Sequence, residues 1–233
     1  MSDYGYVKRN YEALLREIGE YEERLGRKIT LVAVTKSGTD EELEALVASG
    51  ACDLGENRPG EVKRRAELLR SKGYAPRFHE IGNLQRNKVK LVIDEADLIH
   101  SVGKYELAEE ISKQAVRLGI TARVLIEINS GREQSKGGAM PEDAADLAMA
   151  VKKLPGISLR GLMTMGPALD NAEDMRPYFR LTKEIFDRIS NTIGFDGEGI
   201  LSMGMSDSYA VAIEEGSTLI RVGRKLFDKN EGR

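Results

Sequence analysis

The residue best suited to chemistry in this sequence is a lysine at the end of a strand-like segment. Residues 31–38 read L-V-A-V-T-K-S-G, so apolar and β-branched residues precede Lys36 and a turn signal follows it. Such a strand delivers an amine to the edge of a sheet, where partial loss of water favours the neutral, nucleophilic form. The amine can form a Schiff base with pyridoxal phosphate (PLP) or with a sugar or keto acid. It can equally pair with a phosphate or carboxylate, and position alone leaves these alternatives open.

Two late segments carry the small residues expected of a phosphate site. Residues 201–209, L-S-M-G-M-S-D-S-Y, place Ser202, Gly204 and Ser206 between a strand and a helix. Residues 220–224, I-R-V-G-R, place Gly223 directly after the next strand. Free N–H groups at a helix start attract anions, and small residues let the backbone approach the oxygens. A helix cap and a simple turn explain either segment alone equally well.

The elements that position these residues alternate between strand and helix along the whole chain. After an amphipathic helix over 4–26, the pattern predicts strands at 29–35, 52–54, 77–81, 98–102, 122–128, 159–165, 200–203 and 218–222. Helices are expected at 40–49, 61–71, 84–92, 105–118, 141–154, 172–192 and 207–215. Strands joined by helices pair in parallel, which leaves an open doubly wound sheet or a closed barrel.

Unusual polar or glycine residues follow almost every one of these strands, which favours a single (β/α)8 barrel with one central site. No proline-rich or low-complexity linker interrupts the pattern, so we expect one domain over residues 1–233. Within such a barrel, Arg221 alternates with Ile220 and Val222 and is expected to point inward. It would either donate to a pyridine nitrogen, leaving that nitrogen unprotonated, or form a structural ion pair.

Composition excludes several classes of function. The net charge is −3 and the pI is near 5.7, which does not favour nucleic acid or anionic membranes as partners. Cys52 is the only cysteine, so no disulfide can form within the chain. The N-terminal segment is polar and helix-patterned, whereas a secretory signal needs an apolar core, so we expect a soluble cytoplasmic protein. The two histidines, His79 and His100, lack ligand spacing, so no metal site is predicted, and His79 is expected to hydrogen-bond near the barrel mouth.

Seven ordered motifs resemble the PLP homeostasis protein family, also called the YggS or PROSC family. They are A-V-T-K (33–36), G-E-N (55–57), H-E-I-G-N-L-Q-R-N-K (79–88), S-K-G-G (135–138), L-R-G-L-M-T-M (159–165), S-M-G-M-S-D (202–207) and R-V-G-R-K-L-F (221–227). Members are single-domain barrels similar to the N-terminal domain of alanine racemase. The resemblance therefore implies a barrel of this type with an extra N-terminal helix, and PLP as the cofactor.

The resemblance also implies a role for each site residue. Lys36 would carry the Schiff base, and Arg221 would face the pyridine nitrogen. The phosphate would bind to the 202–206 loop, that is Ser202, Gly204 and Ser206, together with Gly223 and the backbone of Arg224. Asn57 and Met163 would line the ring pocket. The chain departs from the usual family pattern at Arg58, Glu80, Asn83 and Gly137, which we place on the outer rim.

Function remains open between three hypotheses. The family implies a PLP carrier without efficient catalysis and hence without catalytic residues of its own, affecting amino-acid and keto-acid balance, with PLP-dependent apo-enzymes as acceptors. We expect a monomer. A PLP-dependent racemase would need an opposing acid such as Tyr209, although the sequence ends six residues after Phe227 and leaves no room for an added domain. A cofactor-free Schiff-base aldolase would use Lys36 and the phosphate loops but leave Arg221 without a role.

Overall fold

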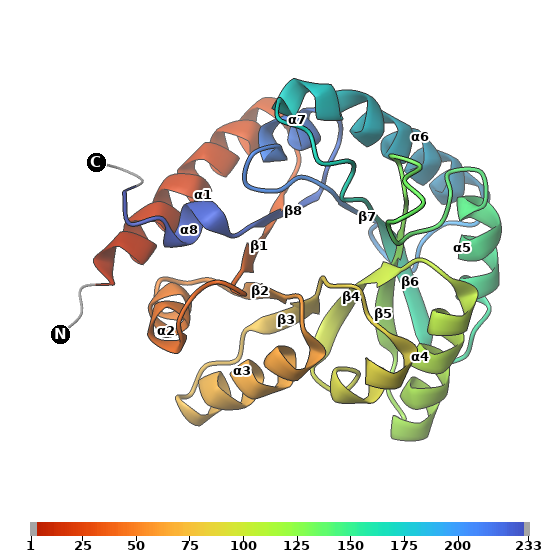
Figure 1. The fold of residues 1–233 in the computed structure, drawn as a ribbon, viewed down its shortest axis with the longest axis horizontal. Coiled ribbons are helices and arrows are strands. Elements are labelled where there is room, and N and C mark those ends of the chain that lie inside the picture. The colour runs from red at the N-terminus through yellow and green to blue at the C-terminus, as the bar shows by residue number, and fades with distance from the viewer. Residues whose placement is uncertain (1–3, 231–233) are drawn as a thin grey trace.

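The alternating segments form a closed barrel of eight parallel strands, which confirms the predicted fold (Figure 1). The computed structural model describes residues 4–230. The strands are β1 Thr30–Val34, β2 Asp53–Glu56, β3 Arg77–Glu80, β4 Ala96–Val102, β5 Ala122–Glu127, β6 Ile157–Met163, β7 Ile200–Ser202 and β8 Leu219–Val222. Parallel pairing of β1 with β8 closes the sheet, so all eight carboxyl ends lie at one end of the barrel.

Alternation along the strands arranges the barrel interior in layers. Five buried apolar residues form a cluster of their own inside the barrel: Val32, Leu98, Leu125, Met163 and Leu219. Because successive side chains alternate between the two faces of a strand, the next inward positions lie two residues further on. Three of these next positions are Glu127, Met165 and Arg221, and all three line a cavity at the carboxyl ends of the strands.

The helices surround the barrel and bury its outer surface (Figure 1). They are α1 Gly5–Leu25, α2 Asp40–Ala48, α3 Pro59–Ser71, α4 Tyr105–Leu118, α5 Ala144–Lys152, α6 Arg176–Thr192, α7 Tyr209–Glu214 and α8 Arg224–Phe227, with 3₁₀ turns η1 Arg86–Leu91 and η2 Ala172–Met175. The expected helix over 172–192 is divided at Arg176, because Pro177 lacks an N–H and suits only a first helical turn. None of the helices within residues 4–230 is long and apolar enough to cross a membrane.

The predicted extra N-terminal helix is α1, which packs against α2 and α8 (Figure 1). Gly26 ends it in the left-handed conformation with φ of 64°, which favours glycine. The Asn10 side chain donates to the carbonyl oxygens of Leu226 and Asp228, at 3.4 and 2.8 Å. The buried Tyr6 hydroxyl donates to Glu42 on α2. The contacts of Asn10 fix the segment after β8 against α1, and the contact of Tyr6 fixes α2 against it.

Candidate functional site

A cavity of about 850 Å³ opens at the carboxyl ends of the strands, and we call it the mouth cavity. Its volume lies within the range of roughly 300–1,000 Å³ that is usual for small-molecule sites. Six of the predicted cofactor residues are on its wall: Lys36, Asn57, Ser206, Arg221, Gly223 and Arg224. The structure therefore brings together residues from both ends of the sequence around one space.

Lys36 follows β1 in a tight turn, in which the Gly38 N–H donates to the Thr35 carbonyl oxygen at 2.9 Å. Its side chain lines the mouth cavity, as predicted. Lys36 is exposed to solvent. Within the described part of the chain no hydrogen bond or ion pair holds its amine, so the amine is available to a ligand.

Arg221 is a buried cation that faces the mouth cavity from β8, with 4% of its surface exposed. Its Nη1 donates to Ser202 Oγ at 2.6 Å, and its Nη2 donates to the Thr164 carbonyl oxygen at 3.0 Å. Burial lowers the pKa of Arg221 to about 10, and the opposing charge of Glu127 counteracts this shift. The guanidinium therefore stays protonated at neutral pH and can act only as a hydrogen-bond donor.

Beneath Arg221, a chain of hydrogen bonds runs through the barrel interior. Ser202 Oγ lies 3.1 Å from His100 Nδ1, His100 Nε2 lies 2.9 Å from His79 Nδ1, and His79 Nε2 lies 3.0 Å from Asp53 Oδ1. Arg77 donates to both oxygens of Asp53, at 2.7 and 2.6 Å. His79 thus lies in the barrel core and not near the mouth as expected.

Arg221 and Asp53 fix the donor and acceptor roles at the two ends of this hydrogen-bond chain. Burial lowers the pKa of His100 well below its usual value, so His100 is neutral. Arg221 can only donate, so Ser202 Oγ accepts from it. The ionised Asp53 can only accept, so His79 donates to it from Nε2. Burial raises the pKa of Asp53, but hydrogen bonds from Arg77 and His79 outweigh it and lower the value to about 2.

The loops after β7 and β8 meet at the mouth cavity. The Gly223 N–H donates to Ser206 Oγ at 3.3 Å, which joins the two loops. Among residues 4–230, the N–H groups of Ser206 and Arg224 donate to no other group of the chain, so both are open to an anion. A Cβ at Gly223 would lie 3.0 Å from the Val34 carbonyl oxygen, so the backbone here needs a residue without a side chain. This geometry agrees with a phosphate cradle.

Three predicted residues lie beneath or behind the mouth cavity and not on its wall. Met163 belongs to the apolar layer inside the barrel, one layer too deep, and Met165 is on the wall in its place. Ser202 is fully buried under Arg221. Gly204 packs against α7, and a Cβ added at Gly204 would lie 2.6 Å from the Cβ of Ala212. Ser202 and Gly204 thus support the cradle from below.

Ser101 and Glu127 are on the wall of the mouth cavity and were not among the predicted site residues. Ser101 on β4 is buried, and its Oγ has no hydrogen-bond partner in the described chain. A buried hydroxyl without a partner on a cavity wall can hydrogen-bond to a polar ligand or to water in the cavity. Glu127 ends β5, and burial raises its pKa while Arg221 counteracts the shift. A charged residue closing an apolar strand, the signal that identified Lys36, would also have found Glu127.

The four departures from the family pattern do not all lie on the rim. Asn83 and Gly137 are on the wall of the mouth cavity, and Arg58 is exposed. Glu80 is fully buried behind the wall, which corrects its placement on the outer rim. Its Oε1 accepts from the Gly82 N–H at 2.9 Å, and its Oε2 has no partner among residues 4–230.

Glu80 gives the protein a measurable pH dependence. Burial raises the pKa of Glu80 to about 7, the Gly82 N–H opposes the shift and the charge of Glu56 adds to it. A carboxyl whose folded-state pKa is raised stabilises the fold below its ordinary pKa, 4.5, and this stability is lost as the pH rises through about 7. We expect the Glu80→Gln protein to gain up to roughly 3 kcal/mol relative to wild type between pH 5 and 8.

Urea denaturation at several pH values measures this difference. Glu67→Gln on the exposed side of α3 is the matched control and should leave the pH profile of wild type unchanged. A Glu80→Gln protein whose stability follows the wild-type profile through pH 8 would show that Glu80 does not titrate in this range.

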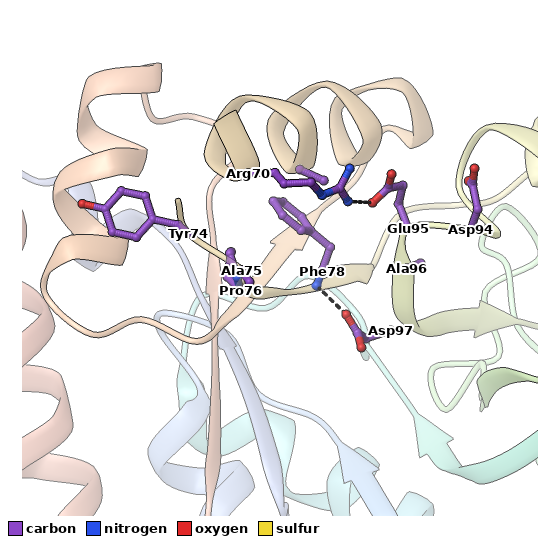
Figure 2. Close-up of a pocket in the computed structure, with 10 residues that line it drawn as sticks. Arg70, Tyr74, Ala75, Pro76, Phe78, Asp94, Glu95, Ala96 and Asp97 are labelled. Carbon is purple, nitrogen blue, oxygen red and sulfur yellow. Dashed lines mark hydrogen bonds and ion pairs between the residues drawn. The ribbon is translucent and has the colours of Figure 1, made fainter. Parts of the chain in front are cut away.

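A second hollow of about 270 Å³ lies at the opposite end of the barrel, beside the starts of β3 and β4 (Figure 2). Three of its four charged side chains, those of Arg70, Glu95 and Asp97, already have partners in the protein. Arg70 Nη2 lies 2.7 Å from Glu95 Oε2, and Asp97 Oδ2 accepts from the Phe78 N–H at 3.1 Å (Figure 2). The first contact joins α3 to the residue before β4, and the second joins β3 to β4, so both hold structural elements together.

Comparison with known proteins agrees with this geometry. The family model for the alanine racemase N-terminal domain matches residues 10–230. The pyridoxal phosphate homeostasis protein of Aquifex aeolicus is 39% identical over 221 residues, which cover 94% of this chain and 96% of that protein. The chain belongs to the pyridoxal phosphate homeostasis protein family. Another member, from Helicobacter pylori, is 31% identical over 97% of this chain and 99% of its own.

Solved structures show the same family fold. PipY of Synechococcus elongatus, determined with PLP bound, has a TM-score of 0.83 at 26% identity and covers 95% of this chain and 100% of its own. Alanine racemase of Clostridium difficile has a TM-score of 0.73 at 21% identity over 94% of this chain, which corresponds to 56% of the enzyme. The second likeness shows a shared fold alone.

Proposed function

We propose that this protein binds PLP in the mouth cavity and acts in PLP homeostasis as a carrier. The observation that supports this best is the convergence of the Lys36 amine, the buried Arg221 and two anion-accepting loops on one cavity. The names of its relatives and the PLP-bound structure of PipY support the choice of ligand. When bound, PLP supplies an aldehyde that can form a Schiff base with a primary amine.

The donors on the wall match the functional groups of PLP. Lys36 would hold the aldehyde, and the loops with Ser206, Gly223 and the Arg224 backbone would hold the phosphate. Arg221, which can only donate, would face the ring nitrogen. Asn57 would line the ring pocket. The orphaned hydroxyl of Ser101 would gain a partner from the ligand.

Exposure of Lys36 supports a carrier in preference to an enzyme. A ligand anchored at an exposed amine stays accessible to water and to the amines of acceptor proteins. Catalytic sites, by contrast, commonly exclude water around the reacting atoms. The same accessibility would let PLP-dependent apo-enzymes receive the cofactor.

The racemase hypothesis needs Tyr209 as the opposing acid, and the position of Tyr209 does not support that role. Racemisation needs acid–base groups on both faces of the reacting carbon. Tyr209 is buried, lies behind Gly204 and accepts a hydrogen bond from Lys225 Nζ at 3.1 Å. It is not on the wall of the mouth cavity. We therefore propose that the protein lacks efficient catalysis of its own.

Titration of the purified protein with PLP, and separately with pyridoxal, tests the proposal. Pyridoxal carries the aldehyde but no phosphate, so it cannot use the loops after β7 and β8. We expect PLP to bind at least roughly 100-fold more tightly, about 2.7 kcal/mol. Equal affinity for PLP and pyridoxal would contradict the proposed phosphate cradle. Rapid exchange of the α-hydrogen of alanine by the PLP-loaded protein in D2O would contradict the carrier role.

A further inference from the structure

A buried ion pair lies behind the turn that carries Lys36. It joins Glu56 at the end of β2 to Arg65 on α3, with 2.7 Å between Arg65 Nη1 and Glu56 Oε1. The two residues are 1% and 5% exposed. Neither is on the wall of the mouth cavity, so neither contacts a ligand there. Apolar residues of similar volume often stabilise a fold as well as a buried ion pair does, so stability alone is a weak explanation for this one.

The guanidinium of Arg65 contacts the backbone on both sides of Lys36. Its Nη1 donates to the Thr35 carbonyl oxygen at 2.6 Å, and its Nη2 donates to the Gly38 carbonyl oxygen at 2.8 Å. The planar fork of the guanidinium thus spans the turn from Thr35 to Gly38. Glu56 adds a third contact, because it accepts from the Thr35 hydroxyl. The backbone of Lys36 is therefore held at both ends.

The lysine side chain itself lacks such support. Lys36 is exposed, and within residues 4–230 its amine contacts no hydrogen-bond or ion-pair partner. A lysine has four rotatable side-chain bonds, so its amine samples many directions, and the position of the backbone turn sets which part of the mouth cavity it can reach. Among the described residues, Arg65 is the only charged side chain that donates hydrogen bonds to the backbone of this turn.

We propose that Arg65, held by Glu56, is a positioning residue that fixes the Thr35–Gly38 turn and so directs the Lys36 amine at the aldehyde of its ligand. This inference rests on the proposed function, in which Lys36 anchors PLP. Small displacements of a reacting group can reduce reaction rates roughly 100-fold. If the contacts that hold the Thr35–Gly38 turn are lost, covalent binding of PLP to Lys36 should therefore weaken. Noncovalent binding of PLP in the mouth cavity should stay unchanged.

Two variants separate positioning from folding. Arg65→Met alone would leave Glu56 buried without its partner and could unfold the protein. The pair Arg65→Met with Glu56→Leu removes both charges together and keeps the volume, but it cannot hold the two carbonyl oxygens. Arg65→Lys keeps the charge but loses the planar fork. The matched control is Arg64→Met, whose arginine is exposed and pairs with Asp40 and Glu61.

The test compares dissociation constants for PLP and for 4′-deoxypyridoxine 5′-phosphate, which has the ring and phosphate but no aldehyde. For the double variant we expect roughly 10- to 100-fold weaker PLP binding and an analogue affinity within about twofold of wild type. Arg65→Lys should fall between the double variant and wild type, and Arg64→Met should match wild type. Thermal unfolding verifies that each variant is folded.

Two results would overturn the positioning role. One is wild-type affinity for both ligands in the double variant and in Arg65→Lys. The other is an equal loss of affinity for both ligands, which would mean that Arg65 supports the whole cavity and not the lysine. Wild-type protein that forms no adduct with PLP would instead contradict the proposed function, so the two failures are distinguishable.

Discussion

Lys36→Ala is expected to lose the visible absorbance that PLP gives on binding to the wild-type protein. Lys36 is on the wall of the mouth cavity, and its amine has no partner in the described chain. Without the amine, PLP is held only by noncovalent contacts to its ring and phosphate. We expect its affinity to fall by roughly 100-fold or more, about 2.7 kcal/mol. Absorbance titration of the two proteins measures the difference.

The control for this experiment is Lys136→Ala. Lys136 is also on the wall of the mouth cavity, on the loop after β5, and it supplies a second amine of the same chemistry. Its replacement should leave both the absorbance and the affinity close to those of wild type. If Lys36→Ala kept the band and Lys136→Ala lost it, the assignment of the anchoring lysine would be wrong.

Arg221→Met should lose both stability and PLP affinity. The substitution leaves Ser202 Oγ and the Thr164 carbonyl oxygen, both buried, without the donor that each has now. Hydrogen bonds of this kind to a charged group contribute about 1.5–3 kcal/mol each, so loss of both should lower the free energy of unfolding by roughly 3–6 kcal/mol. Loss of the donor that we propose to face the ring should weaken PLP binding by roughly 10- to 100-fold. Urea denaturation and PLP titration measure the two effects.

Arg224→Met provides the comparison for this variant. Arg224 is on the same cavity wall, but its side chain is exposed and pairs with Asp207 at the surface. Its proposed contribution to the phosphate site is its backbone N–H, which methionine retains. Wild-type stability and affinity in Arg221→Met would contradict the role of Arg221 as a buried donor.

The barrel was predictable from the sequence because strands and helices alternate with short connections. The second strand shows where the pattern was less clear. It was expected at 52–54, and β2 in fact continues through Gly55 and Glu56. Glycine and glutamate are more typical of loops than of strands. A Cβ added at Gly55 would lie 2.9 Å from Val32 Cγ1, so close packing inside the barrel favours glycine at this strand position.

The candidate site was predictable where one strand end determines a residue's position. Lys36 and Arg221 are examples, because alternation along β1 and β8 is enough to place both at the mouth cavity. Depth within the barrel was not predictable in the same way, since Met163 and Met165 share an inward direction and only the position along the strand separates them. The pairing of His79 with His100 depends on the register of β3 and β4, which shifts between Phe78 and His79.

The contacts of Arg65 show a further limit of sequence reasoning. The residue lies on a helix among other charged residues, and nothing in its spacing distinguishes it from its exposed neighbour Arg64. Its burial follows from the packing of α3 against β2 and β3. Only the three-dimensional structure shows that its guanidinium reaches the turn before α2.

The most direct measurement of the central claim is mass spectrometry after borohydride reduction of the PLP-saturated protein. Reduction makes a Schiff base permanent, so the adduct can be located in a peptide digest. We predict one pyridoxyl phosphate group per chain, on the peptide that contains Lys36. An unmodified protein, or an adduct confined to a different lysine, would contradict the account.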